Sequence, residues 1–363
     1  MIVPGTGPGP GRPVAVPAQR NPTPEADWSF CRGMLPQVSR TFALGIALLP
    51  RELSRPITLS YLLCRIADTV EDGAGLPISR RQELLAVLQQ ALTDPTVSLA
   101  DLAAAASGTG PQDLLVRSAD WVLAAFRRLP PGDRACIVPR VEEMIAGMSR
   151  SLPVSGQPGL RFAALADLER YCYYVAGTVG HLLTGLFQRH CPGITVARHA
   201  ELSSRATGFG LGLQLTNVIR DLPEDHADGR ILVPDAIWNQ ARLTPELVFQ
   251  PPYQTQAVAV LEMLVLEADR HLRTALEYCR LLPRRAFRVR LFCLSSMIFA
   301  RRTLGLVWRQ RADWSVGRRL KMSRHEVYLL LLASALVAPF NSLSSWLFAR
   351  VVSGRNTLPA TTR

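Results

Sequence analysis

The chain has 363 residues, 48% of them hydrophobic, which allows a large core in one or two domains. A formal net charge of +12 favours an anionic partner, such as nucleic acid, an anionic membrane surface or a phosphorylated substrate. No zinc-finger spacing or RNA-binding signature accompanies the charge, which argues against nucleic acid. The seven scattered cysteines, never spaced C-x-x-C, exclude a disulfide framework and favour reduced, buried thiols in a cytoplasmic protein.

The positive charge is concentrated late in the chain. Between Arg270 and Arg324 lie fifteen Arg or Lys residues against only Glu277 and Asp313, which indicates a membrane or phosphate partner. Lys321 is the only lysine of the chain. Because ammonium and guanidinium groups are not interchangeable, this lysine is a candidate for a specific contact, although chance survival explains it equally well.

Residues 1–24 are rich in Gly and Pro and lack the apolar segment of a signal peptide, so we expect a disordered tail. From there the periodicity is helical and predicts one all-α domain over residues 25–350, followed by a flexible C-terminal tail, 351–363. The pattern predicts helices at 26–37, 40–48, 52–72, 79–92, 112–128, 133–150, 165–189, 195–221, 235–240, 245–249, 254–280, 284–310 and 323–350. Residues 93–111 are expected to form a loop.

The stretch 327–349 is nearly uncharged and approaches the length of a membrane span. Pro339 and Asn341 lie near its middle, and four serines add polarity. We therefore expect a final core helix, or one lying at a membrane surface, in preference to a true span.

A first acidic cluster follows an apolar helical segment: Asp68, Glu71 and Asp72. Residues three and four apart share a helix face, and carboxylates grouped in this way suit Mg²⁺, which bridges carboxylates to phosphates. Arg40 and Arg65 are placed to grip the remaining phosphate oxygens. The alternative is a solvated acidic helix end, but the preceding residues 61–67 are too apolar for a surface face.

A second cluster lies about 150 residues later and contains Asp221, Glu224 and Asp225. The apolar helix that leads into it places Gln214, Asn217 and Asp221 on one face, where buried polar groups need partners. A hydrated metal site supplies such partners, whereas a polar helix–helix seam is the alternative. Pro223 is expected to end or kink this helix and to leave Asp225 on a turn.

A third segment combines Tyr171, Tyr173 and Tyr174 with Gly177 and Gly180. Small residues allow close backbone approach, and aromatic faces stabilise a cation. Tight helix packing with a tyrosine hydrogen bond is the simpler interpretation, and both can hold.

Four motifs in this order resemble the squalene/phytoene synthases: Ser39-Arg-Thr-Phe-Ala43, Asp68-Thr-Val-Glu-Asp72, Tyr171-Cys-Tyr-Tyr-Val-Ala-Gly-Thr-Val-Gly180 and Asn217-Val-Ile-Arg-Asp221. Glu224, Asp225 and Gly229-Arg230 follow the last motif, and the resemblance covers about residues 28–335. It implies a single all-α domain of the isoprenoid synthase type around a central cavity, and head-to-head joining of two prenyl diphosphates.

The resemblance also implies roles for individual residues. The implied metal ligands are Asp68, Glu71, Asp72, Asn217, Asp221, Glu224 and Asp225. The implied substrate contacts are Ser39, Arg40, Phe42, Arg65, Gln214, Asn217 and Arg220. Tyr171 is the candidate for proton handling or cation stabilisation, beside the catalytic aspartates Asp68, Asp72, Asp221 and Asp225.

Within the family the tyrosine motif resembles the phytoene synthases. The motif at Ser39 and the segment Lys321-Met-Ser-Arg324 resemble the squalene synthases, in which a similar segment lies near the phosphates of NADPH. We prefer a bacterial-type squalene synthase that joins two farnesyl diphosphates through presqualene diphosphate, with Mg²⁺ and NADPH as cofactors and Lys321 and Arg324 at the nucleotide. The alternatives are a phytoene synthase acting on geranylgeranyl diphosphate without reductant, and a presqualene diphosphate synthase.

A hypothesis of another class is a non-enzymatic, basic helical protein that binds membranes or nucleic acid through residues 270–324. The preferred hypothesis instead expects a monomer, with no nucleic-acid partner, lying peripherally on the cytoplasmic face of a membrane.

Overall fold

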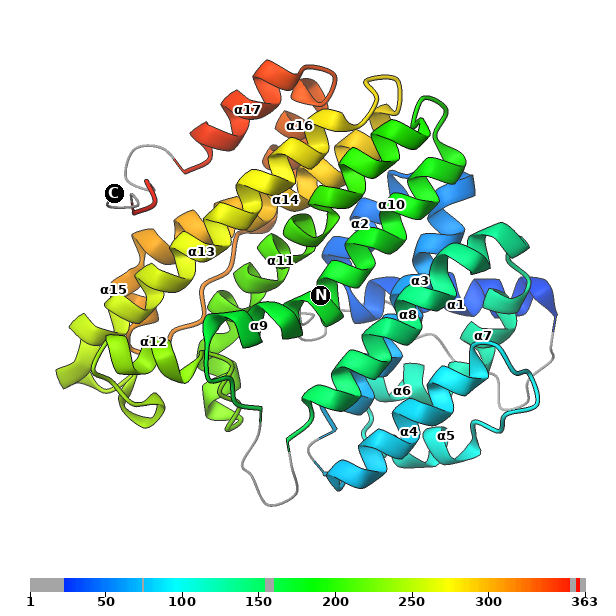
Figure 1. Cartoon of the computed structure of the whole chain (residues 1–363), viewed down its shortest axis with the longest axis horizontal. Helices are drawn as coiled ribbons and strands as arrows, with labels where there is room; N and C mark the ends of the chain where they lie inside the picture. The colour runs from blue at the N-terminus through cyan, green and yellow to red at the C-terminus, as the bar shows by residue number, and fades with distance from the viewer. Residues whose placement is uncertain (1–22, 74, 154–159, 353–356, 360–363) are drawn as a thin grey trace. The chain divides into compact units, whose positions relative to one another are not determined.

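The protein is all-α, as the sequence predicts. The computed structural model describes residues 23–73, 75–153, 160–352 and 357–359, and no β-strand occurs within these ranges (Figure 1). The predicted N-terminal tail lies outside the described residues up to residue 22, and the first helix begins at Pro24. Most of the predicted C-terminal tail also lies outside them. All seven cysteines are free thiols, and six are buried.

The helices form two compact units, and each is described by itself. The first comprises Ile2–Leu152 with Gly185–His190, and the second Pro153–Thr184 with Cys191–Arg363. The helices of the first unit are α1 Pro24–Val38, α2 Arg40–Ala47, α3 Arg51–Glu71, α4 Ile78–Ala91, α5 Ala100–Ala105, α6 Pro111–Arg117, α7 Ala119–Arg127 and α8 Pro131–Ser151.

Helix α3 is the centre of the first unit. It packs against α1, α2, α4, α6, α7 and α8, and 16 of its 21 residues are buried. A helix that is apolar all round is buried all round, and Leu59 to Ala67 fit this pattern. The first acidic cluster therefore stands at the carboxyl end of a rigid core helix, not on a surface helix.

The second unit is built around the long helix α11. Its elements are α9 Leu165–Cys172, the π-helix η1 Tyr173–Gly177, the first part of α10 Thr178–His190, α11 Val196–Ala227, α12 Asp235–Gln240, the 3₁₀ turns η2 Pro245–Leu247 and η3 Pro251–Tyr253, α13 Gln254–Leu281, α14 Phe287–Arg309, α15 Arg311–Trp314, α16 Arg324–Val337 and α17 Asn341–Arg350. Helix α11 packs against α9, η1, α13 and α14, and Figure 1 shows α11, α13 and α14 running side by side.

Glycines let α11 approach its neighbours closely. A Cβ at Gly180 would overlap the carbonyl oxygen of Ala206, and one at Gly210 would overlap that of Ala176. The small residues of the tyrosine segment thus serve tight helix packing, one of the two interpretations that the sequence left open.

Most predicted helices are confirmed, and the differences have local causes. The stretch 93–111, expected to be a loop, contains the alanine-rich helix α5, and the predicted helix 112–128 is divided between α6 and α7. The predicted helix 165–189 is interrupted by the π-helix η1. The predicted helix 323–350 is two helices, because Pro339 cannot donate a helical hydrogen bond and Phe340 is extended.

The break at Pro339 leaves no single helix over 327–349 that could cross a membrane. Helix α14 has the length and composition of a span, but 78% of its apolar window is buried inside the protein, as in a core helix.

Candidate active site

The first acidic cluster is divided between buried and exposed positions. Asp68 and Glu71 are buried on α3, whereas Asp72 caps its carboxyl end and is exposed. Burial raises the pKa of Asp68 to about 6; the charge of Asp72 adds to the rise and Arg65 opposes it. The protein alone therefore compensates the charged form of Asp68 incompletely.

Predicted substrate contacts of the first unit meet α3 at Tyr61, two turns before Asp68. Ser39 caps α2, with its Oγ accepting from the backbone N–H of Phe42 at 3.3 Å. The ring of Phe42 stacks on Tyr61 with 5.0 Å between centroids, and Arg65 Nη2 lies 3.4 Å from the Tyr61 hydroxyl. Arg40 begins α2 and is exposed. The motif at Ser39 is thus joined to α3 through Tyr61, a residue that the sequence analysis did not select.

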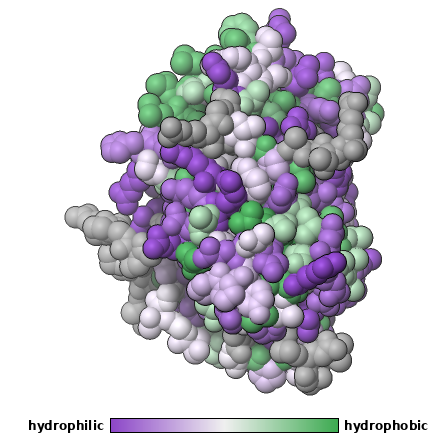
Figure 2. Space-filling model, turned by 90° about the vertical axis from the view of Figure 1, so that its left-hand side faces the viewer, coloured by the Kyte–Doolittle hydropathy of each residue, from purple (hydrophilic) through white to green (hydrophobic). Residues whose placement is uncertain are grey.

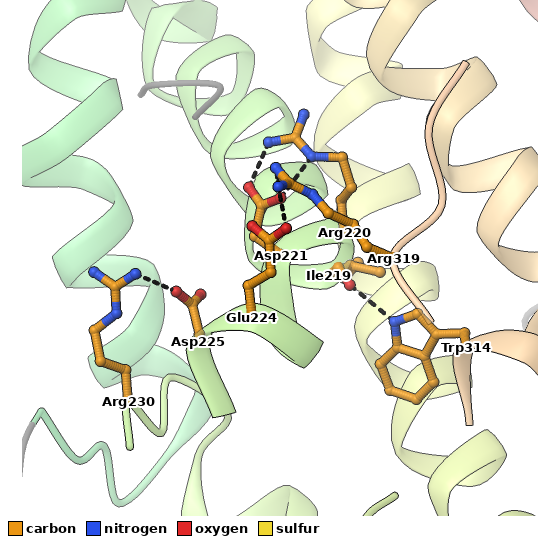
Figure 3. Close-up of polar contacts among 8 residues, drawn as sticks. All are labelled: Ile219, Arg220, Asp221, Glu224, Asp225, Arg230, Trp314 and Arg319. Atoms are coloured by element: carbon orange, nitrogen blue, oxygen red, sulfur yellow. Dashed lines mark hydrogen bonds and ion pairs between the residues drawn. The ribbon is translucent and has the colours of Figure 1, made fainter. Parts of the chain in front are cut away.

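The second cluster lies on α11 in the other unit (Figure 3). The predicted polar residues lie along one helical face, at successive turns: Gln214, Asn217, Asp221, Glu224 and Asp225. Asp221 and Asp225 are buried. A row of carboxylates held at this depth requires positive partners.

Arginines supply those partners at Asp221. The guanidinium of Arg220 donates to both carboxylate oxygens, with Nε 2.8 Å from Oδ1. Arg319 bridges two acids, with Nη2 donating to Asp221 Oδ1 at 2.9 Å and Nη1 donating to Glu224. Planar guanidinium groups also match phosphate oxygens, so this group is suited to hold a diphosphate beside a cation.

Asp225 has its own arginine. Arg230 Nη2 donates to Asp225 Oδ1 at 2.6 Å (Figure 3). The chain turns back toward Asp225 at Gly229, which places Arg230 for this contact. The φ of Gly229, +74°, lies in the left-handed region that glycine adopts readily. Gly229-Arg230 belongs to the family motif found in the sequence, but no role was predicted for Arg230.

Pro223 was predicted to end or kink the helix, and the helix does not end there. Helix α11 continues to Ala227, so Asp225 stays one turn beyond Asp221. Proline has no N–H and leaves the Ile219 carbonyl without its helical donor. The indole Nε1 of the fully buried Trp314 donates to that carbonyl at 3.0 Å instead (Figure 3).

This Trp314 contact fixes the start of a segment that carries basic residues past the second cluster. Arg319 lies in it, and the predicted nucleotide contacts Lys321 and Arg324 follow, both exposed. Arg319 was not predicted from the sequence. The only sequence signal for it is its place in the basic segment, two residues before the lone lysine.

Tyr171 is buried at the end of α9, with its ring 5.5 Å from that of Phe162. The π-helix begins two residues later, where the backbone N–H of Thr178 bonds to the Tyr173 carbonyl. Such turns are frequent at functional sites, and this one re-aims the side chains that follow Tyr171.

The residues of the two clusters fit a hard divalent cation. Carboxylate and amide oxygens are the ligands that Mg²⁺ prefers. Gln214 Oε1 is buried and has no hydrogen-bond partner among the described residues, so the α11 face offers an oxygen that the protein itself does not use.

A second group with ligand-type side chains joins α9 to α13: Glu169, Glu267 and His271. Arg270 Nη2 already donates to Glu169 at 2.9 Å and also to Glu267. We therefore interpret this group as a structural ion-pair cluster.

The all-α fold is of the isoprenoid synthase type, as its superposition on a solved squalene synthase structure shows. The family model for squalene/phytoene synthase matches residues 35–326. The chain therefore belongs to the squalene/phytoene synthase family.

Relatives support this membership. Squalene synthase from Mycosarcoma maydis is 32% identical over 298 residues, which cover 77% of this chain and 50% of that protein. Squalene synthase 1 from Arabidopsis thaliana is 29% identical over 294 residues, with 80% and 68% covered. The solved structure of TcSQS with the ligand BPH1237 superposes with a TM-score of 0.78 at 28% identity, covering 93% and 94%. The chain spans between 50% and 58% of the first curated relatives it matches.

Proposed function

We propose that the protein is a squalene synthase, which joins two farnesyl diphosphates head to head and reduces the product with NADPH. The observation that carries the proposal is the polar face of α11, where Asp221, Glu224 and Asp225 lie in a row with arginines on each. The squalene synthases among the relatives support the choice of substrate.

In the proposed reaction the C–O bond of one diphosphate breaks, and the double bond of the second chain attacks the allylic cation. A proton then leaves to close a cyclopropane. Bound Mg²⁺ would neutralise the leaving diphosphate, held by the carboxylates and by Asn217. Arg40, Arg65 and Arg220 hold phosphate oxygens whose charge grows as the bond breaks, and the buried ring of Tyr171 stabilises the cation or accepts the proton.

The cyclopropyl diphosphate then loses its own diphosphate and rearranges, and NADPH would supply the hydride that reduces the resulting cation to squalene. Lys321 and Arg324 are exposed next to the Arg319 contact, where cationic side chains suit the phosphates of the nucleotide. We further propose a monomer that works on the cytoplasmic face of a membrane, because prenyl substrates and a hydrocarbon product partition into lipid.

The product analysis tests the proposal. Purified protein with farnesyl diphosphate and Mg²⁺ should yield squalene only when NADPH is added, and a chelator should stop turnover until Mg²⁺ is restored. Turnover confined to geranylgeranyl diphosphate would instead identify a phytoene synthase. Accumulation of presqualene diphosphate despite NADPH would identify a presqualene diphosphate synthase.

Removing single charges tests the site. We expect Asp68→Asn and Asp221→Asn each to lower kcat by about 10³-fold or more with the fold intact, because each weakens the hold on the leaving group. The matched control is Asp228→Asn, an exposed residue just after the second cluster. If both clusters act on one diphosphate, the double variant should lose little more than either single variant. Unchanged turnover in both single variants would overturn the assigned site, and a wild type that turns over no prenyl diphosphate would favour the non-enzymatic alternative.

A further inference from the structure

Large apolar side chains face solvent on the C-terminal helical hairpin. Of the ten exposed ones in the described part of the chain, seven belong to α16, α17 and the turn between them: Tyr328, Leu329, Leu332, Leu336, Phe340, Leu343 and Trp346. Leu336 is 68% exposed and Leu329 67%. Figure 2 shows apolar residues gathered in the upper part of that view. We call these seven residues the docking face.

The exposed residues follow helical spacing, so they form stripes and not scattered points. On α16, Leu329, Leu332 and Leu336 recur at intervals of three and four, and on α17 Leu343 and Trp346 lie one turn apart. Other side chains of the hairpin, among them Val337, point inward and pack on the unit. The hairpin is therefore amphipathic, with its apolar side turned outward.

The hairpin is fixed at its turn. The buried guanidinium of Arg290 donates from Nε to the Ala338 carbonyl at 2.6 Å and from Nη2 to Asn341 Oδ1 at 2.7 Å. Its Nη1 donates to the Leu282 carbonyl at 2.6 Å. Three bonds from one guanidinium thus join the α16–α17 turn to the α13–α14 turn, so the docking face is presented in a fixed orientation.

Exposed arginines surround the joined turns. The α13–α14 turn carries Arg280, Arg284, Arg285 and Arg288. No acidic residue occurs between Glu277 and Asp313 or after Glu326. Phe287 on this turn adds an exposed apolar side chain beside the arginines. An apolar face with arginines at its joined turns is complementary to an anionic, amphipathic partner.

We propose that the docking face is the surface through which the protein binds an anionic lipid bilayer, with α16 and α17 lying in the interface. Helices of 14 and 10 residues are about 21 and 15 Å long, too short to cross a hydrocarbon core of about 30 Å. Leucines form the centre of the face, and Trp346 and Tyr328 suit the headgroup boundary. The arginine border meets anionic headgroups. The proposal rests on the membrane location proposed above and is independent of the proposed reaction.

A second copy of the chain fits this face less well. A two-fold contact would bring the same patch of both copies together, and the arginine borders would then face each other without an acidic residue between them. A lipid surface covers the leucines and neutralises the arginines at once.

Flotation with vesicles tests the proposal on the full chain. Wild type should float with vesicles of phosphatidylcholine mixed with phosphatidylglycerol at physiological salt. Leu332→Gln/Leu336→Gln/Leu343→Gln should bind at least about tenfold more weakly, because each leucine loses its transfer from water. Arg284→Gln/Arg285→Gln should lose about tenfold on the anionic vesicles, because about 1 kcal/mol is expected for each arginine at such a surface.

Matched controls lie at other positions of the same unit. Val316→Gln changes an exposed apolar residue outside the face, and Arg309→Gln/Arg311→Gln removes two charges at the far end of α14. Both controls should float like wild type. Brominated lipids should quench part of the tryptophan emission of wild type and less of it in Trp346→Phe.

The proposal is overturned if wild type fails to float, or if the leucine variant floats unchanged. It is also overturned if wild type sediments as a dimer without lipid and the leucine variant as a monomer, since the partner is then a second copy. Turnover in detergent, measured on the same variants, should stay at the wild-type value. That measurement separates a failure of docking from a failure of the proposed reaction.

Discussion

Gly180 shows how strongly one residue constrains the second unit. Its backbone lies against the Ala206 carbonyl of α11, where even a methyl group does not fit. The same helix carries Gly185, where a Cβ would meet Cys136 Sγ at 3.5 Å, an ordinary contact. The two glycines therefore form a matched pair, one required by packing and the other not.

Gly180→Ala should lower the free energy of unfolding by about 2–3 kcal/mol, because the backbones of α10 and α11 must move apart. Gly185→Ala should be neutral or stabilising by up to about 1 kcal/mol through helix propensity. Urea denaturation of both variants measures the difference. Equal stabilities would contradict the close approach at Gly180.

Individual site residues were predictable where chemistry and spacing coincide. Asp221 and Asn217 recur on one face of an apolar helix, and the structure places them there. Arg319 was not predictable, since it reaches Asp221 from almost 100 residues away and stands among many other arginines. Only the folded chain selects one arginine of a basic segment. That both clusters serve one diphosphate remains a prediction.

At the scale of the element, Pro223 and Trp314 compensate each other within α11. The proline removes a helical donor beside the acidic row, and the indole of α15 replaces it at Ile219. The connection between α15 and α16 is thereby fixed to the turn of α11 that carries Asp221. The carbonyl that Pro223 leaves without a helical donor thus accepts the hydrogen bond that holds another segment of the chain.

A double-mutant cycle tests whether the Trp314 indole replaces the donor that Pro223 lacks. Trp314→Phe should cost about 1–3 kcal/mol for the unpaired buried carbonyl, in addition to the loss of ring volume. In the background of Pro223→Ala the new N–H can bond to Ile219, so the cost of Trp314→Phe should fall by at least about 1 kcal/mol. The volume term is common to both backgrounds and cancels. Strictly additive stabilities in urea denaturation would show that the indole does not replace the missing donor.

Periodicity predicted which segments are helical, but it did not predict where each helix ends. The helical pattern around 195–221 identified α11 but ended it early, because a sequence rule for proline cannot include a donor from a distant tryptophan. In contrast, Pro339 does divide α16 from α17, since the Ala338 carbonyl there accepts from Arg290 and the chain turns. Tertiary partners decide between the two outcomes.

For the whole molecule, buried thiols dominate the response to alkali. Burial raises the pKa of Cys31, Cys64, Cys172 and Cys279 to about 12. These thiols stay protonated in the folded protein but ionise near pH 8.5 when unfolded. Their contribution to stability is therefore complete below that pH and is lost as the pH rises toward 12. The seven tyrosines titrate near pH 10 when unfolded, and burial also raises the pKa of Tyr61 and Tyr278, so the thiols are read most cleanly below pH 10.

We expect the free energy of unfolding to fall by about 1 kcal/mol per buried thiol for each pH unit above about 9. Urea denaturation at several pH values between 7.5 and 10.5 measures the slope. Cys64→Ala should flatten it more than Cys136→Ala, since Cys136 is only partly buried. A slope that is the same in both variants would refute the assignment to buried thiols.

The lone lysine gives the protein a practical property. Lys321 is exposed on the stretch that the Trp314 contact holds beside α11. Apart from the α-amino group, a succinimidyl dye finds one primary amine in the entire chain. Ordinary acylation chemistry thus removes the charge of this one side chain without any engineered residue, and protection of Lys321 from the dye by NADPH becomes a direct readout of nucleotide binding at the proposed position.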